Sequence, residues 1–276
     1  MKKDYIPVEE SQTHLDEAAF VEAYWTRMWD GQTFPSAAQQ DIERRDEFRV
    51  MDPYLSTLAP KSRLLDGGCG LGEWSLYYAS RGYEVVGLDI SRATIERLAS
   101  RFPQHTFITG DLRKTTFADA SFHAYYSWGT FEHFEEGLGP CLREAARILK
   151  PHGYLFISIP FQNGRHTRRD AKPLRHWDEH FDPQLGYRMP MRFYQWRLTE
   201  SELQRELEIH GFKTLKMVPI HKWDGLHRFT RHNLGLNPRS RGARLLQRLL
   251  YPVIPRQYVA HMLMAVAQRR ATAGDR

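Results

Sequence analysis

The sequence contains only two cysteines in 276 residues, Cys69 and Cys141. Two cysteines cannot build the disulfide framework of a small secreted protein or a four-cysteine zinc site. The chain also lacks an apolar run of the about 18 residues that a membrane span requires, and its best candidate, residues 259–267, contains a histidine. No apolar segment of a secretory signal follows Lys2 and Lys3. These absences predict a cytoplasmic protein.

Acidic residues are almost missing from the last part of the chain. From residue 225 onward there are ten arginines and one acid, Asp275, so the basic charge of the protein is concentrated there. Two sets of side chains fall on opposite sides of a predicted helix: three arginines (Arg241, Arg244 and Arg248) and four leucines (Leu245, Leu246, Leu249 and Leu250). This pattern predicts peripheral contact with an anionic membrane, at the inner face of a membrane if the protein is cytoplasmic. The alternative is a leucine stripe packed on the core beneath a solvated basic face. Nucleic acid is disfavoured as a partner, because no base-reading motif accompanies the arginines.

Short apolar runs alternate with helical stretches along most of the chain, which is typical of a parallel sheet built from βαβ units. The predicted strands lie at residues 62–66, 83–88, 106–109, 123–128, 154–159, 212–218 and 260–267. We therefore predict an α/β fold with a doubly wound, Rossmann-like sheet.

The sheet is expected to form the core of a domain over residues 56–270. Residues 1–55 carry clustered aromatics at helical spacing and predict a helical N-terminal cap. Two connections, 161–198 and 221–258, are long enough to be insertions or lids over the active site. Residues 271–276 are expected to form a flexible tail.

The first predicted strand ends in Asp66 and turns through Gly68, Gly70 and Gly72 into a helix that begins near Glu73. Glycines are needed where the backbone takes a positive φ or where a ligand lies against it. A dinucleotide-binding loop that starts at Gly68 would need its third glycine at position 73, where the glutamate would repel a pyrophosphate. The turn is better suited to a cationic ligand such as S-adenosyl-L-methionine, which carries an ammonium and a sulfonium and no phosphate.

Two further acids follow successive strands, and the carboxyl ends of parallel strands meet at one crevice. Asp89 is placed to accept hydrogen bonds from both ribose hydroxyls of the nucleoside. Asp111 could accept one from the adenine amino group, with Ile90 and Leu112 on the two faces of the ring. The ordinary alternative for an acid in such a position is a helix N-cap.

Several segments resemble the class I S-adenosylmethionine-dependent methyltransferases, close to the type-11 small-molecule group. They are residues 65–72, 86–91, 110–112, 127–134 and 142–160. The resemblance implies that Asp66, Gly68, Gly70 and the backbone near Trp128 hold the methionine end of the cofactor. It implies methyl transfer from S-adenosylmethionine, giving S-adenosylhomocysteine, but does not identify the acceptor. We predict an oxygen, nitrogen or carbon atom of a small-molecule or lipid-linked acceptor.

Glu132 and His133 lie just after the fourth predicted strand, where the donated methyl group should point. His133 is therefore a candidate general base that deprotonates the acceptor. Alternatively, the pair shapes the cofactor pocket or caps the next helix, because methyl transfer from a sulfonium can proceed by proximity and desolvation alone.

No metal site is expected. In the ubiquinone-pathway O-methyltransferases, which this segment also resembles, a glutamate three residues before the Glu-His pair helps to hold a metal, whereas this chain has Gly129. The histidines and acids of the first long connection match no standard ligand spacing. They are His166, His176, Asp178, Glu179 and His180.

Seven aromatic residues are candidates for an acceptor pocket or for ordinary core: Tyr24, Trp25, Trp74, Trp128, Phe193, Tyr194 and Trp196. Two other functions remain open at this point. The chain could be an RNA or protein methyltransferase that docks through its basic C-terminal region, or a relative that binds S-adenosylmethionine without catalysis.

Overall fold

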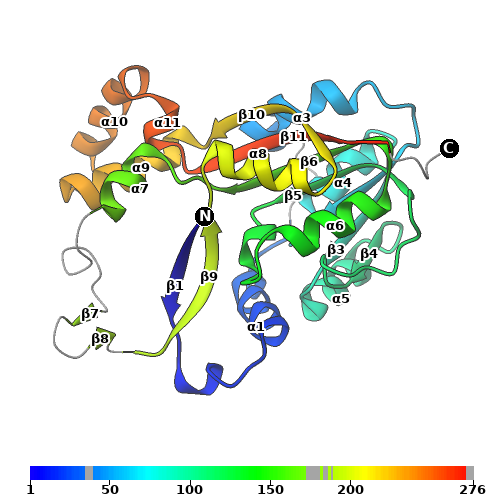
Figure 1. Cartoon of the computed structure of the whole chain (residues 1–276), viewed down its shortest axis with the longest axis horizontal. Helices are drawn as coiled ribbons and strands as arrows, with labels where there is room; N and C mark the ends of the chain where they lie inside the picture. Colours follow the sequence, from blue (N-terminus) through cyan, green and yellow to red (C-terminus); the bar gives the residue numbers. More distant parts are fainter. Residues whose placement is uncertain (35–39, 172–180, 183–185, 188, 272–276) are drawn as a thin grey trace.

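The computed structural model describes residues 1–34, 40–171, 181–182, 186–187 and 189–271. Its centre is a seven-stranded sheet (Figure 1). In spatial order the strands are β10 (Phe212–Ile220), β11 (Met262–Arg269), β6 (Leu149–Pro160), β5 (Phe122–Trp128), β2 (Arg63–Gly67), β3 (Glu84–Asp89) and β4 (Thr106–Thr109). The strands from β6 to β4 are parallel, and β11 runs antiparallel to both of its neighbours. The predicted doubly wound α/β sheet is confirmed.

Both faces of this sheet are buried, because successive strand residues point to opposite sides. In β2, Leu65 faces one hydrophobic cluster and Leu64 faces the other. In β11, Leu263 and Ala265 share the side of Leu65, and Met264 lies on the opposite side. The apolar runs that identified the strands in the sequence are therefore those of a sheet covered on both faces.

Helices cover the two faces in separate sets. The helices around the sheet are α3 (Asp46–Leu55), α4 (Glu73–Ser80), α5 (Arg92–Arg101), α6 (Gly139–Ile148) and α8 (Glu200–Ile209). Buried residues of α6 and α8 belong to the cluster of Leu65, and those of α3 and α4 belong to the cluster of Leu64. The helix α5 packs against β3 and β4. The glycine turn between β2 and α4 thus lies at the carboxyl edge of a sheet that is covered by helices on both faces.

The N-terminal segment differs from the predicted helical cap, because it begins with a strand. β1 (Lys2–Pro7) pairs antiparallel with β9 (Met191–Arg197), and an ion pair of 2.9 Å joins Asp4 to the buried Arg197. The paired residues are 184 to 195 positions apart in the sequence, so local sequence patterns cannot predict this pairing. The other regular elements described before α3 are helical: η1 (Glu10–Gln12), α1 (Glu17–Trp29) and α2 (Gln40–Glu43).

The two long connections contain regular elements of their own. The first holds α7 (Gly164–Asp170), the short pair β7 (Phe181–Asp182) and β8 (Gly186–Tyr187), and β9. The second is largely helical, with α9 (Lys222–Leu234), α10 (Arg241–Val253) and α11 (Arg256–Val259). Figure 1 shows α7, α9, α10 and α11 gathered at the end of the sheet where β6 finishes and β11 begins. A lid function for them stays a prediction, and the flexible tail lies, apart from residue 271, outside the described residues.

The longest helices, α1, α9 and α10, have 13 residues each among the elements described. Within that part of the chain, no helix combines the length and the apolar character needed to cross a membrane.

Candidate functional site

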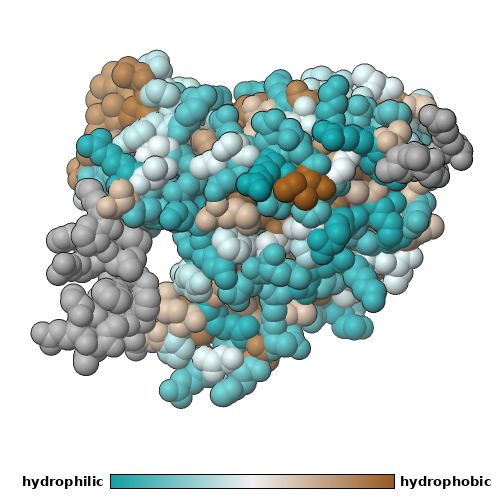
Figure 2. Space-filling model, viewed as in Figure 1, coloured by the Kyte–Doolittle hydropathy of each residue, from teal (hydrophilic) through white to brown (hydrophobic). Residues whose placement is uncertain are grey.

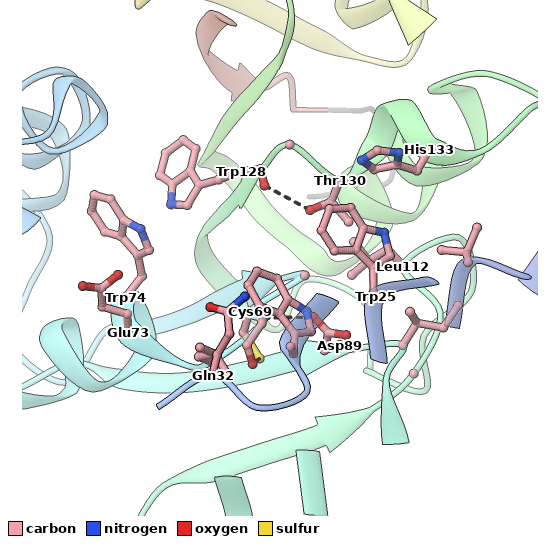
Figure 3. Close-up of a pocket in the computed structure, with 18 of the residues that line it drawn as sticks. Trp25, Gln32, Cys69, Glu73, Trp74, Asp89, Leu112, Trp128, Thr130 and His133 are labelled. Atoms are coloured by element: carbon pink, nitrogen blue, oxygen red, sulfur yellow. Dashed lines mark hydrogen bonds between the residues drawn. The ribbon is translucent and has the colours of Figure 1, made fainter. Parts of the chain in front are cut away.

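A cavity of about 350 Å³ lies where β2, β3 and β5 end. Figure 3 shows most of the residues that line it. Seven residues predicted from the sequence line it: Gly68, Gly70, Asp89, Ile90, Leu112, Trp128 and His133. The carboxyl ends of three neighbouring strands therefore do meet at one site.

The glycine turn forms one wall of this cavity. Gly68 and Gly70 have φ values of +74° and +51°, which side-chain-bearing residues rarely adopt. A Cβ at Gly68 would lie 2.3 Å from Thr130 Oγ1, and one at Gly70 would lie 2.8 Å from the ring of Trp29. The turn thus packs directly against the loop after β5 and against α1, with no room for a side chain.

Asp89 connects this turn to the end of β3. Its Oδ2 accepts a hydrogen bond from the N–H of Gly70, and its Oδ1 accepts one from the N–H of Ser91, both at 2.9 Å. Asp89 is 5% exposed and lines the cavity. Burial raises the pKa of its carboxyl group, and the backbone hydrogen bonds oppose that rise. Each carboxylate oxygen keeps a lone pair for a further donor, as a nucleoside ribose would provide.

Three predicted residues do not line the cavity. Asp66 is buried behind the turn, where it accepts a 2.6 Å hydrogen bond from Ser75 Oγ, and burial raises its pKa to about 7. Asp111 pairs with Arg113 at 2.7 Å. The free side of Gly72 faces Leu98 and Phe107. The sequence predicts direct cofactor contacts for all three. None of them lines the cavity, since the two carboxylates are turned toward Ser75 and Arg113, and a contact with the cofactor stays a prediction.

Tryptophans form the opposite walls of the cavity. Figure 3 shows Trp74 and Trp128 on one side, with ring centroids 5.4 Å apart, and Trp25 on the other. These are three of the seven candidate aromatics from the sequence, and Trp29 stacks on Trp25 at 5.7 Å. The indole N–H groups of Trp29 and Trp128 are buried and, among the described residues, have no hydrogen-bond acceptor. Such a site offers aromatic faces to a cation.

His133 lies beside Trp25, at 5.0 Å between ring centroids. Its Nδ1 is 2.7 Å from the carbonyl oxygen of Tyr194, so Nδ1 carries the proton and donates, and Nε2 keeps its lone pair. Burial lowers the pKa of His133 to about 4. The imidazole is therefore neutral at physiological pH and accepts protons weakly.

Removing the imidazole tests whether His133 is the base that the sequence suggested. We expect His133→Asn to lower kcat by about tenfold or less, since a base with so low a pKa supplies little of the usual 10²- to 10⁴-fold advantage. Methyl transfer rates measured against pH check this. A loss beyond a hundredfold, together with disappearance of an acidic limb in the wild-type profile, would establish a general base instead.

Glu132 gives the site a pH-dependent stability. It is 1% exposed, its Oε2 has no hydrogen-bond partner in the described part of the chain, and burial raises its pKa to about 8. In the folded protein Glu132 therefore keeps its proton up to about pH 8, whereas in the unfolded chain it loses the proton above the ordinary pKa of a glutamate. The contribution of Glu132 to the free energy of unfolding is thus fully present at low pH and is lost as pH rises through about 8.

We expect Glu132→Gln to flatten this dependence. Relative to the wild type, the variant should gain stability on the order of 1–3 kcal/mol between about pH 5 and about pH 9. Urea unfolding at both pH values measures it. Parallel curves for the two proteins would show that Glu132 is ionised in the folded state throughout.

Nucleophilic cysteine chemistry finds little support at this site. Cys69 lines the cavity, but burial raises the pKa of its thiol well above the ordinary value, which disfavours a nucleophilic thiolate. Among the described residues, no group of three metal-ligating side chains comes together. The Nε2 of His166 is 2.7 Å from Arg165, and its Nδ1 is 3.2 Å from the carbonyl of Phe161. The other candidate ligands, residues 176–180, lie outside the described residues.

The sequence did not identify four polar residues that also line the cavity: Gln32, Arg45, Glu73 and Thr130. Arg45 and Glu73 form an ion pair of 2.6 Å at the first turn of α4. The negative charge of Glu73 was the reason that the sequence disfavoured a pyrophosphate ligand, and in the structure Glu73 lies on the cavity wall together with Arg45. Its arginine partner comes from the N-terminal segment, whose docking no local pattern predicts.

Comparisons with known proteins agree with this geometry. A family model described as a methyltransferase domain matches residues 65–157. A protein of Mycolicibacterium smegmatis, described as a probable S-adenosylmethionine-dependent methyltransferase, is 30% identical over 199 residues, which are 70% of this chain and 68% of the relative. The chain belongs to the S-adenosylmethionine-dependent methyltransferases. Its cofactor is S-adenosylmethionine.

Other relatives of this methyltransferase are matched over less of their length. A malonyl-[acyl-carrier protein] O-methyltransferase of Erwinia pyrifoliae is 32% identical over 96 residues, which are 35% of this chain and 36% of that protein. A solved S-adenosylmethionine-dependent methyltransferase of Mesorhizobium loti, 18% identical, covers 83% of this chain and all of its own with a TM-score of 0.55. The latter likeness shows the shared fold.

Proposed function

We propose that this methyltransferase transfers the methyl group to an oxygen, nitrogen or carbon atom of a small-molecule or lipid-linked acceptor, with S-adenosylhomocysteine as the product. The partial covering of the cavity by α1 carries the proposal. The helix α1 closes over the glycine turn, with the ring of Trp29 beside Gly70 and a 2.7 Å hydrogen bond between Thr26 Oγ1 and Ser91 Oγ. A partly covered, aromatic pocket suits a small molecule or a slender linked group better than a segment of folded macromolecule.

The residues present fit the cofactor. S-adenosylmethionine supplies an electrophilic methyl group on a sulfonium. Asp89 would hold the ribose hydroxyls, Ile90 and Leu112 would flank the adenine, and Gly68 with Gly70 would let the methionine end approach the backbone. The tryptophan faces would favour the positive charge and exclude water, so that positioning and desolvation contribute to the rate.

An acceptor carried on a protein arm also fits such a pocket. The name of the Erwinia relative gives a malonyl group on acyl-carrier protein as its acceptor. The methylated group of such an acceptor is small although the protein that carries it is large. The proposed acceptors therefore include small groups linked to a carrier protein.

Labelled cofactor tests the proposal across all acceptor classes at once. The protein is incubated with methyl-labelled S-adenosylmethionine and a cell extract, which is then separated into small molecules, lipids, protein and RNA. We expect label in the small-molecule or lipid fraction, or on protein in a form released by cleavage of a carrier thioester. Stable label on protein side chains or on RNA would support a macromolecular methyltransferase instead, and no transfer at all would support a binding-only relative.

A further inference from the structure

The helix α10 presents an aliphatic row to the outside of the molecule. Leu245, Leu249 and Val253, spaced four residues apart, are 60%, 63% and 73% exposed. Figure 2 shows an apolar patch at the corner of the molecule where Figure 1 places α10. Exposed apolar patches on a globular domain mark surfaces that bind something.

The inner face of α10 is packed against the rest of the protein. Ala243 and Gln247 are buried, and Gln247 Nε2 donates a 2.8 Å hydrogen bond to Thr230 Oγ1 of α9. Leu246 and Leu250 are half-buried on the same side. The four leucines of this helix therefore do not form one stripe against the core, as the alternative interpretation of the sequence required. Two face inward, and the other two face outward.

Positive charge adjoins the outward row. At about 100° per residue, Arg241, Arg244 and Arg248 follow one another immediately beside Leu245 and Leu249. All three arginines are exposed, and no ion pair to them occurs within the described part of the chain. The helix contains no acidic residue. The arginines and leucines were predicted to lie on opposite sides of the helix, whereas the structure places two of the four leucines on the arginine side.

Two aromatic side chains lie near the C-terminal end of α10, on the other side of the arginines from the aliphatic row. Trp223 and Tyr251 are each 37% exposed, and their rings are 5.8 Å apart. Tryptophan and tyrosine prefer the boundary between lipid headgroups and acyl chains, where an apolar ring and a polar group are both accommodated. The outer face of α10 thus combines exposed aliphatic and basic residues, as does a helix that lies in a membrane interface, and the aromatic pair adjoins the basic side of that face.

We propose that this outer face, composed of Leu245, Leu249 and Val253 with Arg241, Arg244 and Arg248, docks on an anionic lipid bilayer. Charge complementarity selects that occupant. A second copy of the chain would bring the same arginines against each other, and an RNA would leave the aliphatic row without a partner. The helix lies in the headgroup region with the arginines toward the lipid phosphates and the aliphatic row toward the acyl chains. The docking is a property of α10 and is independent of the acceptor proposed above.

Vesicle co-sedimentation of the full chain tests the docking, since it needs no turnover. The protein should bind vesicles of phosphatidylcholine mixed with phosphatidylglycerol, should bind those of phosphatidylcholine alone far more weakly, and should be released by salt. Arg244→Gln with Arg248→Gln should weaken binding about 30-fold, from about 1 kcal/mol for each arginine. Leu245→Gln with Leu249→Gln should weaken it at least about tenfold.

The matched control is Ile209→Gln on α8, where an equally exposed aliphatic residue (63%) lies outside the proposed face. Its vesicle binding should equal that of the wild type, and all variants should keep the wild-type affinity for S-adenosylmethionine. Three results would overturn the proposal. The first is failure of the wild type to bind anionic vesicles, and the second is binding of the arginine and leucine variants to them as tightly as the wild type. The third result is self-association or RNA binding by the wild type that is lost in these variants, in the absence of vesicle binding.

Discussion

Gly68→Ala is expected to destabilise the protein by about 2–4 kcal/mol and to lower its affinity for S-adenosylmethionine more than tenfold. The new Cβ would lie 2.3 Å from Thr130 Oγ1 and 2.7 Å from its Cγ2, at a φ of +74°. The glycine turn and the loop after β5 cannot move away from each other without changing the wall of the cavity. Thermal unfolding and calorimetric titration of the cofactor measure the two effects.

Gly82→Ala is a control that separates the cost of a positive φ in alanine from the steric clash of the new Cβ with Thr130. Gly82 has a φ of +88° but no heavy atom within 4 Å of the position of a Cβ, so its replacement should cost only about 1 kcal/mol and leave cofactor affinity unchanged. Adding Thr130→Ala to Gly68→Ala should recover part of the loss. If Gly68→Ala and Gly82→Ala were equally stable, the close packing of the turn against Thr130 would be refuted.

Asp89→Ala is expected to reduce affinity for S-adenosylmethionine about 100-fold or more, as two charge-assisted hydrogen bonds of about 1.5–3 kcal/mol would be lost. The carboxylate also accepts the N–H groups of Gly70 and Ser91, so its removal loosens the turn. Asp89→Asn should restore shape but not affinity, because the amide NH₂ would face one of these donors.

A carboxylate outside the site controls for net charge. Asp119 is paired with Arg147 and has a 79% exposed side chain, so Asp119→Ala should leave cofactor affinity unchanged. Retention of wild-type affinity by Asp89→Ala in a folded protein would contradict the ribose assignment.

Local chemistry made much of the fold predictable. The capping box of Thr199 and Glu202 opens α8 with both of its hydrogen bonds, and Ser91 caps α5 through the N–H of Thr94. The strands were recognisable because continuous apolar runs are required where both faces of a sheet are buried. These signals depend on neighbours within a few residues, which a sequence displays directly.

Features that depend on distant partners could not be predicted in the same way. The pairing of β1 with β9 and the ion pair of Arg45 with Glu73 need the docked N-terminal segment. The orientation of Asp66 and Asp111 depends on whether Ser75 and Arg113 are within reach. For the site, the sequence therefore indicated the strand ends and the glycine turn, whereas the structure showed which of these side chains reach the cavity.

A crystal structure of the protein with S-adenosylhomocysteine tests the cofactor site most directly. We predict electron density for the ligand along Gly68 and Gly70, with its ribose hydroxyls at Asp89 and its adenine between Ile90 and Leu112. A nucleoside bound elsewhere on the protein, or one in this cavity with its ribose turned away from Asp89, would contradict the assignment.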